Sequence, residues 1–242
     1  MKIILRKVHC YLYIASVAVT YAIAFPVLYL LSRNTANYPS MNAIRRVWGI
    51  ISSGLVGILY NFRYETPVDW SKTYIICPNH TSNLDITAMT IMVENNKHCF
   101  MGKESLLKNF LTRLFFKTVD IPVNRESKVS AYKAFKRASE ALAAGTSVII
   151  FPEGRIYQDY PPFLHEFKNG PFRMAIDLKV PIIPVSSADT WEIMWDTGLE
   201  HGSKPGICHI FVHKPIETAH LTIDDADALR DQVHAIINHK LV

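Results

Sequence analysis

The sequence predicts an α/β fold, in which a mainly parallel β-sheet is flanked by helices and preceded by an N-terminal hydrophobic, membrane-associated helical segment. Short β-branched runs alternate with segments of helical periodicity from about residue 74 to the C-terminus. Residues 8–32 contain no Asp, Glu, Lys or Arg, and about 20 apolar residues can cross a bilayer as a helix. The chain has 242 residues, of which 49% are hydrophobic. This length allows one main core and leaves apolar sequence for lipid to cover.

The first apolar segment, residues 8–32, is predicted to be embedded in a membrane. Basic residues flank it on both sides, so the charge distribution does not establish its topology. A cleaved signal peptide is the competing interpretation, because Ala-Ile-Ala at 22–24 resembles a cleavage site. The apolar run continues past those alanines, however, and exceeds the roughly 7–15 residues of a usual signal-peptide core.

A second apolar segment, residues 48–60, is too short to span a bilayer comfortably, and two arginines precede it. We interpret it as interfacial or re-entrant, with a buried helix of the globular domain as the alternative. The pattern becomes that of a soluble domain at 67–71. We therefore expect membrane-anchoring helices over 1–66 and a globular domain over 67–242.

Strands and helices alternate through the second part of the chain. The strands are expected at 74–78, 98–102, 118–123, 147–152, 180–185 and 208–216. The helices are expected at 86–93, 104–116, 128–144, 171–178 and 224–240. Because sites in such sheets lie where strands end and loops begin, the loop sequences carry the functional information.

The first of these loops contains a histidine and an aspartate five positions apart, His80 and Asp85. His80 ends a predicted strand, and Asp85 falls in the first turn of the next helix. A turn there can fold the carboxylate back toward the imidazole. Such a pair would hold one tautomer of the ring and stabilise the imidazolium formed when the other nitrogen takes a proton from an alcohol. The competing interpretation is a capped helix start with a solvated histidine.

Cations follow the later strands. Arg125 comes directly after one strand, and Glu153, Gly154 and Arg155 follow another. An arginine at a strand end is suited to gripping a phosphate, and glycine permits close approach of the backbone. Lys168 precedes a predicted helix, whose N-terminus also favours an anion. The net charge of +5 points to anionic partners in general: phospholipid head groups, phosphorylated substrates, acidic carrier proteins or nucleic acid.

Several other functions are disfavoured. The four cysteines are scattered without a C-x-x-C pair, which argues against disulfides and a zinc ribbon and fits a reducing compartment. His209 and His213 lie on a predicted strand about 13 Å apart, whereas a shared zinc needs their nitrogens within roughly 4 Å; we expect no metal. No G-x-S-x-G serine-esterase motif is present. Nucleic acid is not an expected partner, because the basic helix residues are typical of solvated faces and a bilayer is the nearer anion.

Four segments together resemble a known family. They are NHTSNLD at 79–85, IPVNR at 121–125, FPEG at 151–154 and VPIIPV at 180–185. In this order they resemble the four motif blocks of the glycerolipid acyltransferases, and most of all those of the bacterial 1-acylglycerol-3-phosphate acyltransferases. The resemblance extends over about residues 74–185.

The resemblance implies transfer of a fatty acyl group from a thioester, on coenzyme A or acyl carrier protein, to the hydroxyl of a lysophospholipid. The expected acceptor is 1-acylglycerol-3-phosphate, giving phosphatidic acid in phospholipid biosynthesis. Glycerol-3-phosphate or an amino-acid-containing lysolipid remain alternative acceptors. The hydroxyl attacks directly, so the reaction needs no serine or cysteine nucleophile, no metal and no cofactor.

The family's roles carry over by position. His80 would be the general base and Asp85 its orienting partner, while Arg125 would hold the acceptor's phosphate and the Glu153–Gly154 turn would shape the acceptor site. The substrate-binding residues are therefore expected to be Asn79, Arg125, Glu153, Gly154, Arg155 and Lys168.

Two positions depart from the family pattern. Arg155 follows Phe-Pro-Glu-Gly directly, where the family often has Thr-Arg, and Val119-Asp120 replaces a common glycine in the second block. These changes leave the role of Arg155 and the identity of the acceptor open.

The resemblance also implies a location at the bacterial inner membrane, with the catalytic domain on the cytoplasmic side, where acyl thioesters are available. Membrane lipids would then be partners. The non-enzyme alternative is a membrane-peripheral lipid-binding protein that keeps the fold without turnover. His80 and Asp85 argue against it, because head-group binding needs arginines and no general base.

Overall fold

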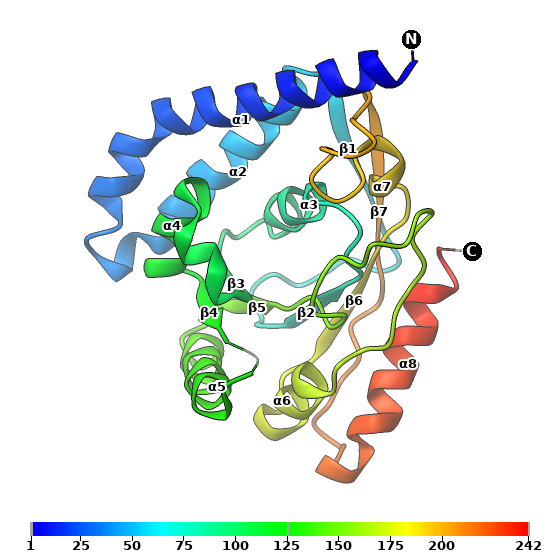
Figure 1. The fold of residues 1–242 in the computed structure, drawn as a ribbon. Coiled ribbons are helices and arrows are strands. Elements are labelled where there is room, and N and C mark those ends of the chain that lie inside the picture. The colour runs from blue at the N-terminus through cyan, green and yellow to red at the C-terminus, as the bar shows by residue number, and fades with distance from the viewer. Residues whose placement is uncertain (1, 125, 242) are drawn as a thin grey trace.

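A seven-stranded sheet forms the centre of the molecule in the computed structural model, which describes residues 2–124 and 126–241 (Figure 1). The strand order is β1-β7-β6-β2-β5-β3-β4. The strands are β1 (Ile58–Tyr64), β2 (Ile75–Pro78), β3 (His98–Lys103), β4 (Ile121–Val123), β5 (Ser147–Ile149), β6 (Ile182–Ser187) and β7 (Gly206–Val212).

The sheet is mainly parallel, as predicted. Every neighbouring pair of strands is parallel except β6 and β7. The carboxyl ends of β2, β3, β4, β5 and β6 therefore lie at the same end of the strands, which we call the carboxyl end of the sheet. The strands β1 and β7 run the other way, so their carboxyl ends point to the opposite end.

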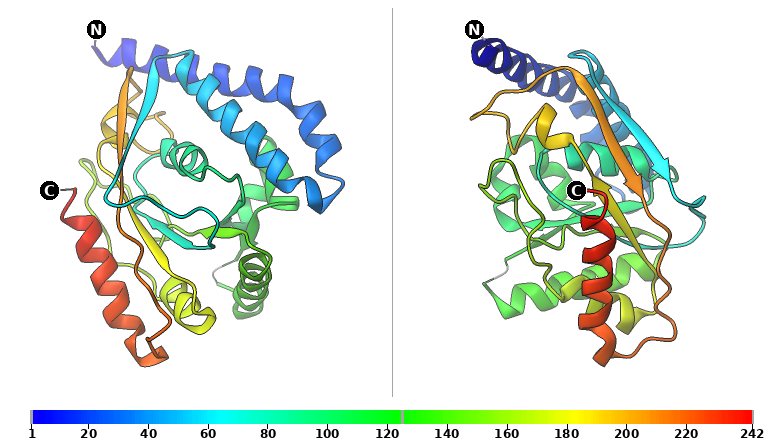
Figure 2. Two further views of the ribbon diagram at one scale, coloured as in Figure 1. Left: turned by 180° about the vertical axis from the view of Figure 1, so that it is seen from behind. Right: turned by 90° about the vertical axis from the view of Figure 1, so that its right-hand side faces the viewer.

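Helices cover both faces of the sheet. The α-helices are α1 (Lys2–Leu31), α2 (Tyr38–Gly54), α3 (Leu84–Met92), α4 (Phe110–Lys117), α5 (Lys128–Ala143), α6 (Gly170–Leu178), α7 (Thr190–Ile193) and α8 (Ala226–Asn238). Short 3₁₀ helices, η1 (Thr35–Asn37), η2 (Glu104–Lys108) and η3 (Ile223–Asp225), precede α2, α4 and α8. Figures 1 and 2 show α1 and α2 side by side along one side of the molecule, with α5, α6 and α8 at the opposite side.

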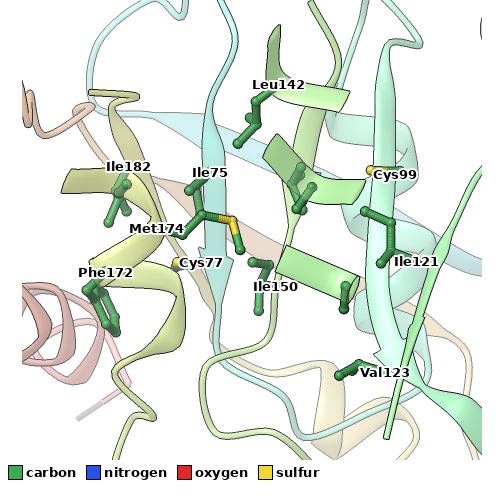
Figure 3. Packing of buried hydrophobic residues seen from close by; sticks show 14 of the residues in the cluster. Ile75, Cys77, Cys99, Ile121, Val123, Leu142, Ile150, Phe172, Met174 and Ile182 are labelled. Carbon is green, nitrogen blue, oxygen red and sulfur yellow. The ribbon is translucent and has the colours of Figure 1, made fainter. Parts of the chain in front are cut away.

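Each face of the sheet has its own hydrophobic core. On one face Ile75 and Cys77 of β2 pack with residues of α5, α6 and α8, and Figure 3 shows them beside Met174 of α6. On the other face Ile76 packs with the residues of α3, including Met89. Strands buried on both faces need apolar residues at every position. This is why β2 and the first four residues of β6 appear in the sequence as unbroken apolar runs.

The apolar segment 48–60 does not form one element. Helix α2 ends at Gly54, and β1 begins at Ile58 and pairs with β7 along its whole length. The sequence pattern did not predict β1, because its first residues continue the apolar run of the preceding helix. The domain boundary between residues 66 and 67 stays a prediction. Strand β1 lies before this boundary in the chain and forms an edge of the sheet.

Helix α1 is the one helix within residues 2–124 and 126–241 that is long and apolar enough to cross a membrane. One side of it is attached to the rest of the molecule. Arg6 donates to the Glu192 carbonyl (3.1 Å), His9 Nδ1 lies 2.6 Å from Ser203 Oγ, and Trp48 Nε1 donates to the Val17 carbonyl (3.1 Å). The other side is exposed and apolar, so α1 lies along the domain with a hydrophobic surface turned outward.

Candidate active site

The predicted His–Asp pair forms at the carboxyl end of the sheet, where β2 leads through a short turn into α3. His80 Nδ1 lies 3.1 Å from Asp85 Oδ2. Asp85 is fully buried, whereas 13% of the His80 side chain is exposed. The turn therefore folds the carboxylate back onto the imidazole, as the spacing predicted. With Nδ1 directed at Asp85, the lone pair of the neutral ring is on Nε2.

Asp85 is held by more than the histidine. Its Oδ2 also accepts the backbone N–H groups of Thr81 and Ser82, both at 2.9 Å, and its Oδ1 accepts the Thr190 hydroxyl at 2.7 Å. A buried carboxylate with this many donors has one orientation. Thr190 was not predicted, because it begins α7 and is distant in sequence. It reaches Asp85 because β6, which leads toward α7, lies beside β2 in the sheet.

The His80 ring is also fixed from its flat side. It stacks on Phe151 with ring centroids 3.9 Å apart and an interplanar angle of 22°. Phe151 follows β5, the strand on the other side of β2 from β6. The stack restricts rotation of the imidazole about its hydrogen bond to Asp85. The direction of Nε2 is therefore set by residues that follow three neighbouring strands, β2, β5 and β6.

Glu153 connects the His80 turn to the long loop after β5. Its Oε1 accepts the His80 backbone N–H (2.8 Å), and its Oε2 accepts the His165 backbone N–H (3.1 Å). The residue is buried, and this burial raises the pKa of its carboxyl group to about 7. Both oxygens are thus used by the protein itself. Glu153 shapes the site by joining two loops.

Two cavities meet beside His80. A polar cavity of about 890 Å³ has four cationic side chains in its lining: Lys103, Lys108, Arg155 and Lys168. An apolar cavity of about 210 Å³ is lined by His80 together with mainly hydrophobic residues, including Phe100, Leu106, Phe116 and Phe151. Gly154 and Arg155 line both. A larger groove of about 930 Å³ lies between α8 and the ends of β1 and β7, and none of the predicted site residues lines it.

The structure brings most of the predicted substrate-binding residues to the polar cavity. Glu153, Gly154, Arg155 and Lys168 line it. Gly154 has φ +86°, a conformation that side-chain-bearing residues rarely adopt. Arg125 lies outside the described residues.

Asn79 is placed differently from the other predicted substrate-binding residues. It is buried, its Nδ2 donates to the Ser187 carbonyl (3.1 Å), and its Oδ1 accepts the Ser187 N–H (2.7 Å). It lines neither the polar nor the apolar cavity. Its side chain instead fastens the end of β2 to the end of β6, behind the His–Asp pair.

A buried ion pair that was not predicted lies near the apolar cavity. Arg45 of α2 donates to both carboxylate oxygens of Asp120, at 3.2 and 3.0 Å, and its guanidinium lies 4.4 Å from the ring centroid of Phe115. Asp120 Oδ1 also accepts the Phe100 N–H. The aspartate that departs from the family pattern thus binds α2 to the sheet and lines neither cavity. In the sequence, the signal for this ion pair was an arginine and an aspartate that each lie within an otherwise apolar segment.

His209 of β7 and His213, which follows that strand, have separate partners. His209 Nδ1 lies 2.6 Å from Asp189 Oδ2, and His213 Nε2 lies 2.9 Å from Ser186 Oγ. Among the described residues, no three His, Cys, Asp or Glu side chains are grouped so that they could hold a metal ion.

Comparison with known proteins gives a consistent result. Residues 60–188 match the family model described as Acyltransferase. The 1-acyl-sn-glycerol-3-phosphate acyltransferase alpha of Mus musculus is 26% identical over 212 residues, which cover 87% of this chain and 72% of the mouse protein. The 1-acyl-sn-glycerol-3-phosphate acyltransferase of Haemophilus influenzae is 28% identical over 169 residues, covering 67% and 66% of the two chains.

A solved structure shares the fold. The crystal structure of PlsC, the 1-acyl-sn-glycerophosphate (LPA) acyltransferase of Thermotoga maritima, superposes with a TM-score of 0.76 at 21% identity. The match covers 99% of this chain and 95% of the other. The long N-terminal helix is therefore included in the shared architecture.

Proposed function

Because this chain belongs to the Acyltransferase family, we propose that it transfers a fatty acyl group from a thioester to the free hydroxyl of 1-acylglycerol-3-phosphate, giving phosphatidic acid. The observation that carries the proposal is the position of the His80–Asp85 pair at an apolar cavity that adjoins a polar cavity with four cationic side chains. The reaction brings together an anionic head group, a hydroxyl and an acyl chain. The site offers a matching surface for each of the three.

His80 acts as general base on the acceptor. Its Nε2 removes the proton of the hydroxyl as the oxygen attacks the thioester carbonyl. The tetrahedral intermediate then collapses, the C–S bond breaks, and the thiolate takes the proton back from the imidazolium. Asp85 stabilises that imidazolium and keeps Nε2 directed at the acceptor. The products are an ester and a free thiol, and the reaction uses no cofactor.

The two cavities divide the substrates. The apolar cavity is lined by aromatic and aliphatic side chains and receives the acyl chain next to the carbonyl. The polar cavity receives the acceptor's phosphate, for which Arg155, Lys168 and Lys103 supply charge. Arg125, adjacent in sequence to Asn124 of this cavity, is proposed to act with them. The acyl donor is a thioester of coenzyme A or of acyl carrier protein.

The exposed apolar surface of α1 and α2 supports attachment to a membrane. Its large exposed residues on α1 include Ile3, Ile4, Leu5, Val8, Leu12, Val19, Ile23, Val27 and Leu30, and on α2 Val47, Ile50 and Ile51. A patch of this kind on two adjacent helices would be unfavourable in water. We propose that it lies in the lipid, which lets the acceptor reach the site from the bilayer. The catalytic domain faces the cytoplasm, where acyl thioesters are made.

The test is a turnover assay on the full-length protein in lipid–detergent micelles, with acyl-coenzyme A and 1-acylglycerol-3-phosphate. Thiol release and product mass are both recorded. Wild type is expected to release thiol only with acceptor present, and His80→Ala to release none above background. His220→Ala, which changes an exposed histidine, is the matched control and should retain full activity. Equal rates in wild type and His80→Ala would contradict the proposal, as would a wild type that binds lysolipid without turnover.

A further inference from the structure

The loop between β5 and α6 carries Arg155 and has no regular secondary structure over residues 150–169. Loops longer than about 12–15 residues are uncommon in compact domains and are usually functional when they are ordered. This one is closed at its base, where the Lys168 N–H donates to the Pro152 carbonyl at 2.9 Å. Glu153, through its bond to the His165 N–H, fastens the returning part of the loop to the His80 turn.

Inside the loop, three side chains form a column. The Arg155 guanidinium lies 4.5 Å from the ring centroid of Tyr157. The Tyr157 ring stacks on His165 with centroids 3.5 Å apart and an interplanar angle of 13°. Asp159 Oδ2 lies 2.8 Å from His165 Nε2 and fixes the orientation of that ring. The ring centroid of Phe163 lies 4.2 Å from that of His165.

We propose that Tyr157, His165 and Asp159 are positioning residues, which hold the Arg155 guanidinium at the junction of the polar and apolar cavities to receive the acceptor's phosphate. The inference rests on the proposed function, because it assumes that the polar cavity takes a phosphate. It assigns to Arg155 the role that its shifted place after Phe-Pro-Glu-Gly left open. It also assigns a role to three residues outside the four motif segments.

The geometry of the column explains why an aromatic ring is used here. Within the described residues, Arg155 makes no side-chain hydrogen bond or ion pair, so Tyr157 is the contact that orients it. The cation–π contact uses none of the N–H groups of the guanidinium and leaves them for a bidentate phosphate contact. A carboxylate partner would occupy those same groups. Arranging the arginine in advance also reduces the entropy lost when the ligand binds.

Arg155 and Tyr157 are separated by one residue, Ile156, and their side chains are in contact. A tyrosine two residues after the arginine thus accompanies the shifted position of the arginine in this chain.

The test compares Tyr157→Ala, Tyr157→Phe and the double variant Arg155→Ala/Tyr157→Ala with Arg155→Ala and wild type. Tyr157→Ala is expected to raise the KM for 1-acylglycerol-3-phosphate about threefold to fivefold, the scale of a cation–π contact at an exposed site. The KM for the donor and kcat should stay within about twofold. Tyr157→Phe keeps the ring and should restore the wild-type KM. The double variant should be no worse than Arg155→Ala, because the tyrosine acts through the arginine.

A merely structural role for Tyr157 would give a different pattern. Equal increases in donor and acceptor KM, no rescue by phenylalanine, or additive effects in the double variant would each overturn the inference. Tyr132→Ala, which changes an exposed tyrosine of α5, controls for general effects of removing a ring. Binding of glycerol-3-phosphate measured by calorimetry on the same variants needs no turnover. If wild type binds it and Tyr157→Ala binds about threefold to fivefold more weakly, the inference holds even where the acyl-transfer assay fails.

Discussion

The two sides of the candidate active site are constructed differently. On the base side, Asp85 is fully buried and held by His80, two backbone N–H groups and Thr190. On the phosphate side, the lysines and Arg155 are exposed and project into a wide polar cavity. A general base must present one atom in one direction. An anion site needs charge and reach, so the chain fixes the proposed base side by hydrogen bonds and the proposed phosphate side by a single aromatic column.

The largest expected effect comes from breaking the base side at its centre. Asp85→Asn keeps the shape of the side chain, but an amide has one acceptor oxygen for the donors that the two carboxylate oxygens now share. The imidazole loses its stabilising charge and its fixed tautomer. We expect kcat to fall by about 10²–10⁴, with acceptor KM little changed, measured at saturating donor. A decrease of less than threefold in a folded variant would show that the carboxylate has no role in orienting the base.

The buried ion pair beside the site differs from the phosphate side in stability as well. Arg45→Met removes one partner of the buried Arg45–Asp120 pair and leaves the carboxylate uncompensated. Such changes cost about 3–5 kcal/mol of unfolding free energy. Lys168→Met, an exposed cation of the polar cavity, is the matched control and should change stability by less than about 0.5 kcal/mol. Denaturant unfolding in detergent measures both, and similar values for the two variants would contradict the contrast.

A pH dependence should arise at the residue that joins the two sides. The pKa of Glu153 is raised from 4.5 to about 7 by burial, so the folded protein keeps a proton that the unfolded chain has lost between these values. Its contribution to stability is therefore full below pH 4.5 and is lost as the pH rises through about 7. We expect wild type to lose about 2–3 kcal/mol relative to Glu153→Gln between pH 5 and 8. Parallel stability curves for the two proteins would argue against a buried, raised carboxyl group.

The smallest expected effect comes from changing Thr190, which the sequence did not predict as part of the site. Thr190→Val removes the hydroxyl that donates to Asp85 Oδ1 while keeping the shape of the side chain. A hydrogen bond to a buried charge contributes about 1.5–3 kcal/mol. We expect its loss to lower kcat about tenfold. Thr190→Ser keeps the donor and should stay within about threefold of wild type. If the serine variant is as slow as the valine variant, packing at this position matters more than the hydrogen bond.

Local features of the site were predictable and distant ones were not. The His80–Asp85 contact forms within one strand–turn–helix unit, so spacing and helix-start chemistry were enough to expect it. Thr190 reaches Asp85 only because β6 lies beside β2, and this neighbour relation depends on strand order, which the sequence pattern does not contain. Asn79 was expected at the substrate for the same reason: nothing in the sequence showed that its amide pairs with the end of β6.

The fold shows the same limit. Alternating apolar and helical segments predicted the parallel strands, each close to its expected place. The pattern did not reveal β1, because a strand that follows an apolar helix without a polar break looks like its continuation. It also did not indicate that β7 runs antiparallel to β6, since strand direction depends on the path of the connection. The Arg155 column lies in an irregular loop, where no periodicity applies.

The central claim is that His80 activates the acceptor hydroxyl for direct attack on the thioester. The most direct test is to mix enzyme at high concentration with acyl-coenzyme A in the absence of acceptor, and to follow thiol release and intact protein mass together. We predict no burst of thiol and no added acyl mass, followed by rapid thiol release once 1-acylglycerol-3-phosphate is added. A stoichiometric burst with the mass of one acyl group on the protein would contradict the claim, because it would show a covalent acyl-enzyme.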